Sequence, residues 1–237
     1  MQPKIQIKIC GVTNANDADA CVELGADMIG FNFYRKSSRY IEPTIARRIV
    51  ETLPARSCPV GVFVDADPAE IRELAEISGV RCVQLHGRAT PESCNELAGE
   101  FRVIRALSTD ARFKPEHTAA FSHCDVLIDA YHPELRGGTG LTCDWSAARD
   151  SIRHTRFLIL SGGLNAGNVG SAIAAVAPHA VDVCSGVESA PGVKDYRALE
   201  QFISVVRAAE RSLRATSTHN PSPHNVILIP QAREKDL

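Results

Sequence analysis

The sequence predicts an α/β fold, namely a single (β/α)8 barrel with a C-terminal extension. Strand-like apolar runs and helix-like segments alternate eight times along the chain of 237 residues. Strict alternation favours a parallel sheet, and eight such units in about 210 residues favour a closed barrel over an open doubly wound sheet. The segments after the strands are also more polar and richer in glycine than those before them. This asymmetry is typical of a barrel whose site lies at the carboxyl ends of its strands.

The strands are expected where apolar residues alternate or run unbroken. In the first, residues 5–11, three isoleucines alternate with Gln6, Lys8 and Cys10, so these polar side chains share the opposite face. The third strand reads as an apolar run of the buried parallel kind. After the first, the strands are expected at residues 28–33, 59–64, 82–85, 102–107, 126–130, 157–160 and 181–184.

Capping residues and prolines predict the helices. Asn16 or Asn14 can cap the first, and Gly25 can end it. Pro43 opens the second helix, which runs to about residue 53. Two further helices begin at Asp67-Pro68 and at Thr90-Pro91, where a cap precedes a proline. The others are expected over 115–121 (short), over 145–152, after the glycine turn at 161–165, and from 195 to about 213.

The domain prediction places the barrel in residues 1–213 and a linker-like tail in residues 214–237. Residues 215–225 are rich in Ser, Thr, Pro, Asn and His, which is typical of a linker. Residues 226–229 form a short apolar run beside Pro230. Docking on the barrel, association and disorder all stay open for this run.

Composition excludes several classes of partner. The net charge is −2, so there is no overall basic field for nucleic acid and no polybasic segment for a membrane surface. The N-terminus lacks an apolar signal region, and no run approaches the ~18 apolar residues of a membrane span. The sequence therefore predicts neither a nucleic-acid nor a membrane partner.

The cysteines and histidines predict neither disulfides nor a metal site. No CxxC, HxxxH or HExxH motif occurs. A disulfide framework is not expected in a chain of this size without a secretory signal, so reduced thiols in a cytoplasm are expected. The eight cysteines are Cys10, Cys21, Cys58, Cys82, Cys94, Cys124, Cys143 and Cys184.

Reactive side chains gather at the predicted strand ends. Barrel closure brings these ends around one mouth. On its own, Cys10 favours the interpretation as a small buried thiol, and Asp129 is equally compatible with a solvated or capping carboxylate. A charge beside an apolar run is nevertheless costly unless it is paired or functional. The strand-end residues are Cys10, Asp65, His86, Arg105, Asp129, Ser161 and Ser185.

Two glycine turns follow the seventh and eighth strands, at Gly162-Gly163 and at Ser185-Gly186. Barrels of this class bind phosphate groups there, on backbone N–H groups and a helix N-terminus. One such turn would be weak evidence, since any tight turn uses glycine. Two, each after the expected strand, favour phosphate binding.

Two charged side chains are predicted to meet inside the barrel. By alternation Asp182 faces inward on the eighth strand, and Lys8 faces inward on the neighbouring first strand. A structural ion pair is one reading, and the ammonium would also help to ionise Cys10. The basic loop 35–39 lies at the same mouth, either as a solvated loop or with an arginine that captures a carboxylate.

Together these motifs resemble the phosphoribosylanthranilate isomerase family of tryptophan biosynthesis. The resemblance covers about residues 4–211, one motif set per strand end, in the family's order. The matching motifs are KICGVT (8–13), SRYI (38–41), VGVFV (60–64), QLHG (84–87), DA (129–130), GGTG (137–140), DW (144–145), SGGL (161–164) and DVCSGVE (182–188).

The resemblance implies an Amadori rearrangement of N-(5-phosphoribosyl)anthranilate to the 1-deoxyribulose 5-phosphate. It implies that Asp129 is the general acid, which opens the furanose ring, and that Cys10 is the general base. Arg39 would hold the anthranilate carboxylate. The other substrate-binding residues would be His86, Asp182, Gly162, Gly163, Ser185 and Gly186.

These roles constrain the two catalytic groups. Cys10 must be shifted towards thiolate by a positive neighbour, and Asp129 must be kept protonated by burial. The resemblance implies a phosphorylated small-molecule substrate and no metal or organic cofactor. It leaves a monomer and a homodimer open.

The chain departs from the family pattern at four places, none of them Cys10 or Asp129. Ser38 replaces a usual proline, Cys184 a serine, Asp65 an asparagine and Cys143 an aromatic residue. These changes bear on substrate affinity more than on activity.

Three other functions fit the sequence less well. A related aldose–ketose isomerase of histidine biosynthesis would call for an aspartate at Cys10 and for repeated half-barrels. A non-catalytic phosphate-binding barrel predicts loss of Cys10 or Asp129, and both are present. A redox sensor would require a resolving partner, and the sequence shows none.

Overall fold

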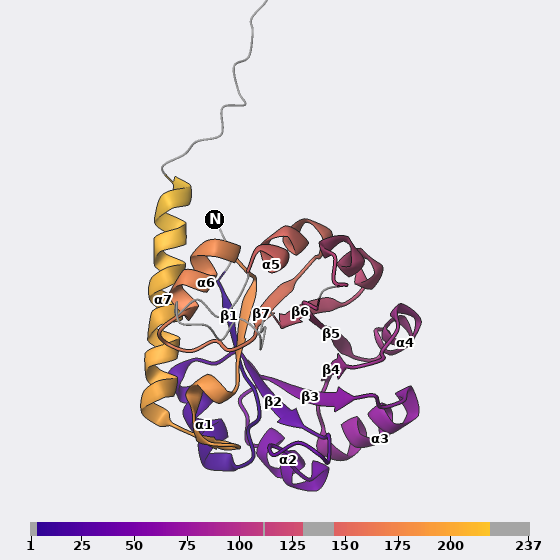
Figure 1. The fold of residues 1–237 in the computed structure, drawn as a ribbon. Helices are drawn as coiled ribbons and strands as arrows, with labels where there is room; N and C mark the ends of the chain where they lie inside the picture. Colours follow the sequence, from indigo (N-terminus) through magenta and orange to yellow (C-terminus); the bar gives the residue numbers. More distant parts are fainter. Residues whose placement is uncertain (1–3, 111, 130–144, 219–237) are drawn as a thin grey trace, which may run out of the picture.

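The computed structural model describes residues 4–110, 112–129 and 145–218 of the chain. Eight parallel strands close into a barrel in the order β1 to β8, and the helices form a ring around it (Figure 1). The (β/α)8 prediction is therefore confirmed. The strands are β1 Gln6–Ile9, β2 Met28–Asn32, β3 Cys58–Val64, β4 Cys82–His86, β5 Arg102–Ser108, β6 Asp125–Asp129, β7 Leu158–Ser161 and β8 Ala180–Val183.

The helices follow the predicted order, and their first residues agree with the capping signals. Asn14, rather than Asn16, caps α1, because its side chain accepts a hydrogen bond from the backbone N–H of Asp17. Asp67 and Thr90 cap α3 and α4 as expected. The α-helices are α1 Ala15–Leu24, α2 Pro43–Val50, α3 Pro68–Ser78, α4 Pro91–Leu97, α5 Ser146–Ser151, α6 Val169–Val176 and α7 Tyr196–Thr218.

The segment between β5 and β6 is a 3-10 helix, η1 Pro115–Phe121, rather than an α-helix. The Thr118 hydroxyl donates to the carbonyl of Pro115, three residues earlier, at 2.6 Å. Such side-chain bonds to the nearby backbone compete with an α-helical pattern, and 3-10 geometry suits short pieces. The expected helix is thus present in a tighter form.

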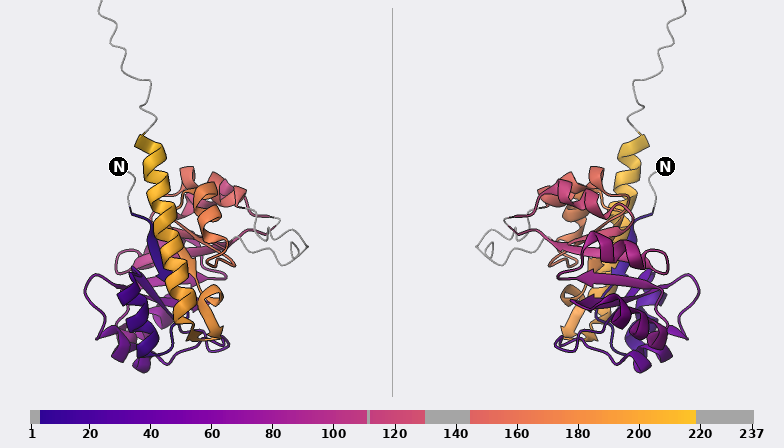
Figure 2. Two further views of the ribbon diagram at one scale, coloured as in Figure 1. Left: turned by 90° about the vertical axis from the view of Figure 1, so that its left-hand side faces the viewer. Right: turned by 90° about the vertical axis from the view of Figure 1, so that its right-hand side faces the viewer.

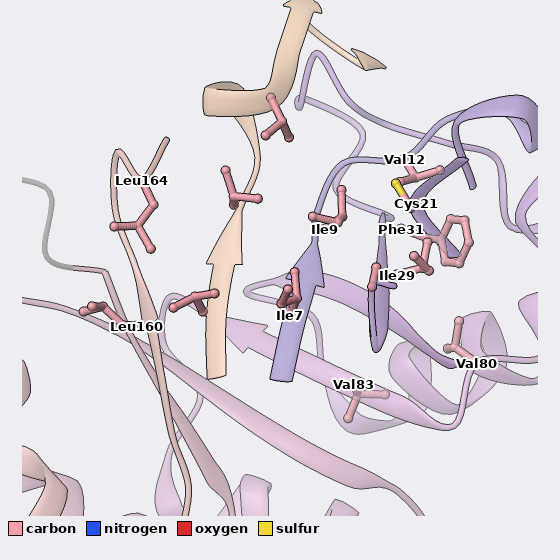
Figure 3. Close-up of a cluster of buried hydrophobic side chains, with 14 of the residues drawn as sticks. Ile7, Ile9, Val12, Cys21, Ile29, Phe31, Val80, Val83, Leu160 and Leu164 are labelled. Carbon is pink, nitrogen blue, oxygen red and sulfur yellow. The ribbon is translucent and has the colours of Figure 1, made fainter. Parts of the chain in front are cut away.

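Two apolar layers hold the barrel together. The larger lies between sheet and helices, where Ile7, Ile29, Val83 and Leu160 point outward from their strands (Figure 3). The smaller fills the barrel interior. Its buried members are Met28, Val60, Cys82, Ile104, Ala106, Leu127, Ile159 and Ala180. Above this inner layer the interior becomes polar, at the carboxyl ends of the strands.

A small hairpin between β8 and α7 was not predicted. It consists of the 3-10 turn η4 Ser185–Val187 and the antiparallel strands β9 Glu188–Ala190 and β10 Val193–Lys194. The hairpin carries a buried lysine, Lys194, back towards the barrel mouth. It therefore belongs to the description of the site.

The last helix is longer than expected. The sequence predicts an end near residue 213, but α7 continues to Thr218 along the side of the barrel and beyond it (Figure 2). Arg214 contacts Glu210 one turn earlier at 2.6 Å, and an ion pair at this spacing supports a helix. The domain boundary at 213/214 stays a prediction, and residues 219–237 lie outside the described part. Within that part no helix is long and apolar enough to cross a membrane.

Candidate active site

A cavity of about 350 Å³ opens at the carboxyl ends of β6, β7 and β8. This volume falls within the range of small-molecule sites. It is lined by Asp129, Ser161, Gly162, Gly163, Leu164, Asp182, Val183, Cys184 and Ser185. The cavity thus brings the predicted acid together with both predicted phosphate turns.

Lys8 and Asp182 form a buried ion pair at the base of this cavity. They are register partners on β1 and β8, and Lys8 Nζ lies 2.7 Å from Asp182 Oδ1. Ser161 donates its hydroxyl to the other carboxylate oxygen at 3.0 Å. Burial alone would lower the pKa of Lys8, but the neighbouring Asp182 carboxylate raises it, so Lys8 keeps its charge. The predicted pairing is confirmed.

Replacing Lys8 by methionine is expected to lower the free energy of unfolding by about 3–5 kcal/mol, because it leaves the buried Asp182 carboxylate uncompensated. Urea denaturation would measure the change as a lower midpoint at unchanged slope. Lys4→Met is the matched control, since Lys4 contacts Asp27 at 2.6 Å but is half exposed. It should change stability by less than about 1 kcal/mol. Equal losses in the two variants would contradict this account.

Cys10 follows β1, and its side chain is buried beside Lys8 and Cys184. Its backbone N–H donates to the carbonyl of Val183 at 2.9 Å, which extends the β1–β8 ladder by one residue. The Cys184 thiol donates a hydrogen bond to the Cys10 sulfur, and the Lys8 ammonium lies close to it. These two effects lower the pKa of Cys10 to about 6, against the opposing effect of burial. Cys10 is therefore largely a thiolate at neutral pH.

Asp129 ends β6 and opens onto the cavity. Its register neighbours are Ser108 on β5 and Ser161 on β7. Asp129 thus lies in the same layer of the mouth as the serine that contacts Asp182. The motif at 137–140 and Cys143, which follow it in sequence, lie outside the described residues.

His86 ends β4 and is neutral in this environment. Burial, and then the positive charge of Lys8, lower its pKa to about 4. Its Nε2 lies 2.6 Å from Nε2 of Gln84, the preceding inward residue on the same strand. His86 can therefore hydrogen bond to a substrate, but it offers no positive charge to an anion.

Arg39 is held by Glu188, the last residue of the DVCSGVE motif at 182–188. Both Nε and Nη2 of Arg39 donate to the Glu188 carboxylate, the shorter contact being 2.6 Å. Lys194 Nζ, fully buried, donates to the same carboxylate at 3.1 Å and to the carbonyl of Cys10 at 2.6 Å. The β9–β10 hairpin thereby connects Arg39, the predicted carboxylate-binding residue, to the backbone of the predicted base.

The two glycine turns touch one another. Gly162 and Gly163 have φ of +100° and +63°, which other residues rarely adopt. A side chain at Gly186 would collide with the carbonyl oxygen of Leu164, so only glycine allows this close approach. Backbone from both turns consequently borders the cavity, as the phosphate prediction requires.

Arg105 does not lie at the mouth. Ile104 and Ala106 occupy the inner layer of β5, so Arg105 points outward by alternation. Its guanidinium donates to the carbonyls of Leu85, Ala106 and Gly87 and stacks over Phe121. The prediction that Arg105 lies at the mouth was therefore wrong. Side chains alternate along a strand, so a residue between two inward-facing side chains points outward even near the strand end.

Asp65 turns from the mouth towards the next loop. It accepts from the backbone N–H of Arg88 at 2.8 Å and contacts the Arg88 side chain.

In the described part of the chain, no group of three or more His, Cys, Asp or Glu side chains could hold a metal ion.

Comparison with known proteins places this site in a family. The family model for N-(5'-phosphoribosyl)anthranilate (PRA) isomerase matches residues 7–205. The chain belongs to the PRA isomerase family. This agrees with the sequence resemblance and does not favour the histidine-pathway alternative.

Curated members of the PRA isomerase family are similar over nearly their whole length. The N-(5'-phosphoribosyl)anthranilate isomerase of Thermotoga maritima is 45% identical over 199 residues, which cover 84% of this chain and 97% of that protein. The enzyme of Trichlorobacter lovleyi is 40% identical over 205 residues, with 86% and 99% covered.

Solved PRA isomerase structures share the fold. The Thermotoga maritima crystal structure superposes with a TM-score of 0.80 at 44% identity, covering 86% of this chain and 99% of that one. A crystal structure of PRA isomerase in complex with reduced 1-(o-carboxyphenylamino)-1-deoxyribulose 5-phosphate has a TM-score of 0.78 at 41% identity, over 86% and 99%. A further structure describes monomers generated from the dimeric Thermotoga enzyme, with a TM-score of 0.77 at 40% identity, over 86% and 99%.

Proposed function

We propose that this PRA isomerase uses Cys10 as general base and Asp129 as general acid in the Amadori rearrangement of N-(5-phosphoribosyl)anthranilate. The supporting observation is the environment of Cys10, a buried thiol with a lowered pKa that hydrogen bonds to Cys184, and Cys184 lines the same cavity as Asp129. The reaction needs one acid and one base around a small sugar, and these two residues supply that pair.

In the proposed reaction two side chains transfer protons. Asp129 protonates the furanose ring oxygen, so that the ring opens to a Schiff base. The Cys10 thiolate then removes the C2 proton of the sugar, and the resulting enol becomes the ketose by moving its hydroxyl proton to C1. The proton on Cys10 returns to Asp129 through solvent before the next turnover. Lys8 stays protonated beside Asp182 and stabilises the thiolate between turnovers.

The proposed substrate orientation follows from the two ends of the molecule. The glycine turns at Gly162-Gly163 and Ser185-Gly186 would bind the phosphate through backbone N–H groups. Arg39 would bind the anthranilate carboxylate at the other end. Glu188 takes Nε and one hydrogen of Nη2, and Nη1 has a long contact of 3.4 Å with the Ser38 hydroxyl. The anthranilate carboxylate would bind at the edge between Nη1 and Nη2. His86 and Asp182 would contact the sugar between them.

We further propose a cytoplasmic enzyme with a phosphorylated small molecule as its ligand and no nucleic-acid or membrane partner. The net charge of −2 supports this, and a reducing compartment suits the free thiols of the described residues. Either a monomer or a homodimer agrees with the site, and analytical ultracentrifugation distinguishes them.

The rate should fall at acid pH, because a general base works only when deprotonated. With a Cys10 pKa of about 6, kcat/KM should drop about tenfold per pH unit below that value. In Cys184→Ala the hydrogen-bond donor is lost, so the pKa that governs the fall in kcat/KM should rise towards ~8.5, the pKa of a free thiol. Cys184→Ser keeps a donor and should stay near the parent profile. Identical profiles in the parent and the alanine variant would contradict the proposed role of Cys184.

Glu188→Gln is expected to raise KM by about tenfold with a smaller effect on kcat, since an amide holds Arg39 less firmly than a carboxylate does. Steady-state kinetics gives both constants. A product analogue that lacks the benzoate carboxylate should bind to the parent and to Glu188→Gln with the same dissociation constant. Glu51→Gln is the matched control, because Glu51 contacts Arg47 on the surface. A kcat loss without a KM change would refute a positioning role through Arg39.

A further inference from the structure

Cys184 lies beside Cys10 on the adjoining strand. Ile9 and Val183 are the last register partners of β1 and β8, and the next residue on each side is a cysteine. The two thiols share a hydrogen bond. The structure therefore places a candidate resolving thiol, Cys184, beside Cys10, and no sequence motif indicates this pairing.

The backbone spacing suits a bond between these sulfurs. Neighbouring strands lie about 4.7–4.9 Å apart, and disulfides join Cα atoms about 4.4–6.8 Å apart. Glycines leave the space around both sulfurs open. An added Cβ at Gly30 would lie 2.9 Å from Cys10 Sγ, and one at Gly11 would lie 3.0 Å from Cys184 Sγ.

The chemical roles of the two thiols differ. Cys10 carries the thiolate, the form that reacts with peroxides. Its side chain is buried, but its neighbour Cys184 lines the cavity at the carboxyl ends of β6, β7 and β8. The hydrogen bond to Cys10, together with burial, raises the pKa of Cys184, so Cys184 remains a protonated thiol. Glu188 Oε1 lies 3.6 Å from Cys184 Sγ and can take up its proton as the sulfur attacks.

We propose that Cys10 and Cys184 form a reversible disulfide under peroxide, which switches the enzyme off and protects Cys10 from irreversible oxidation. Hydrogen peroxide oxidises the Cys10 thiolate, and with one proton taken up gives the sulfenic acid and water. The Cys184 sulfur then attacks the Cys10 sulfur, the S–O bond breaks, and the hydroxyl leaves as water with the Cys184 proton, which Glu188 passes on to it. A dithiol reverses the change by supplying two electrons and two protons.

The loss of turnover rests on the proposed base role of Cys10, whereas bond formation does not. The experiment therefore has two readouts. Purified full-length protein is treated with hydrogen peroxide, and peptide mass spectrometry maps the cross-links. Turnover is followed before treatment, after treatment and after dithiothreitol, and each variant is compared with its own untreated rate.

The parent should show a Cys10–Cys184 cross-link, lose activity by at least about tenfold, and recover to within about twofold with dithiothreitol. Cys184→Ser should instead carry sulfinic or sulfonic acid on Cys10 and should not recover. Cys58→Ser is the matched control. It removes one member of a second thiol pair, Cys58 and Cys82, away from the mouth, and should behave like the parent.

Absence of the Cys10–Cys184 cross-link, or full recovery of oxidised Cys184→Ser, would overturn the proposal. A cross-link that forms without any loss of turnover would keep the disulfide but remove Cys10 from the mechanism. The failure of the inference and the failure of the proposed function are thereby distinguished.

Discussion

Replacing Cys10 by alanine is expected to reduce kcat by roughly a hundredfold to ten-thousandfold, the usual contribution of a positioned general base. Alanine leaves no group that can take the C2 proton. Because Cys10 lies at a strand end and contributes little volume, the barrel should still fold and bind the phosphorylated product. Turnover of freshly generated phosphoribosylanthranilate measures the rate, and product titration measures binding.

Cys10→Ser tests whether the charge of the thiolate, rather than the size of the side chain, is needed for turnover. The serine hydroxyl fits the same space but does not ionise near pH 6, so it should be nearly as slow as alanine. The result that would sink the assignment is near-parent turnover in either variant. Slow turnover together with lost product binding would point instead to a damaged site.

Replacing Asp129 by alanine or by asparagine is the second large expected loss, again roughly a hundredfold to ten-thousandfold in kcat. The amide of asparagine keeps the size of the carboxyl group but cannot give its proton to the ring oxygen. The asparagine variant should therefore bind product like the parent and still fail to open the ring. Rapid-quench analysis would show unconverted substrate on the enzyme.

Asp65→Asn is the matched control for Asp129. It makes the same chemical change at the end of another strand, but Asp65 contacts Arg88 outside the cavity. Turnover should stay within about twofold of the parent. If Asp65→Asn and Asp129→Asn lost the same amount of activity, the loss of a negative charge at a strand end would explain the data better than the loss of a general acid at Asp129.

Much of the architecture could be predicted because its signals are local. Alternation within residues 5–11 puts Lys8 on the inner face, and the order of the units makes β8 its neighbour, so the contact with Asp182 follows. Helix starts at Asp67 and Thr90 depend on a cap and a proline a few residues apart. Cys10 and Asp129 could be placed at strand ends because the apolar runs stop there, whereas their proposed roles as base and acid came from the family resemblance.

The remaining features depend on contacts between distant segments. Lys194 reaches the Cys10 carbonyl across 184 positions, and Glu188 holds Arg39 across 149. No periodicity or motif encodes these distances, because the hairpin that carries both residues reaches the mouth only once the barrel has closed. The same closure lowers the pKa of Cys10, since a thiol and an ammonium must be fixed beside it. The sequence by itself thus determined the barrel and the position of its two proposed catalytic side chains at the strand ends. The tertiary structure alone decided how those side chains are charged and held, because desolvation and hydrogen bonding act between groups that only folding brings together.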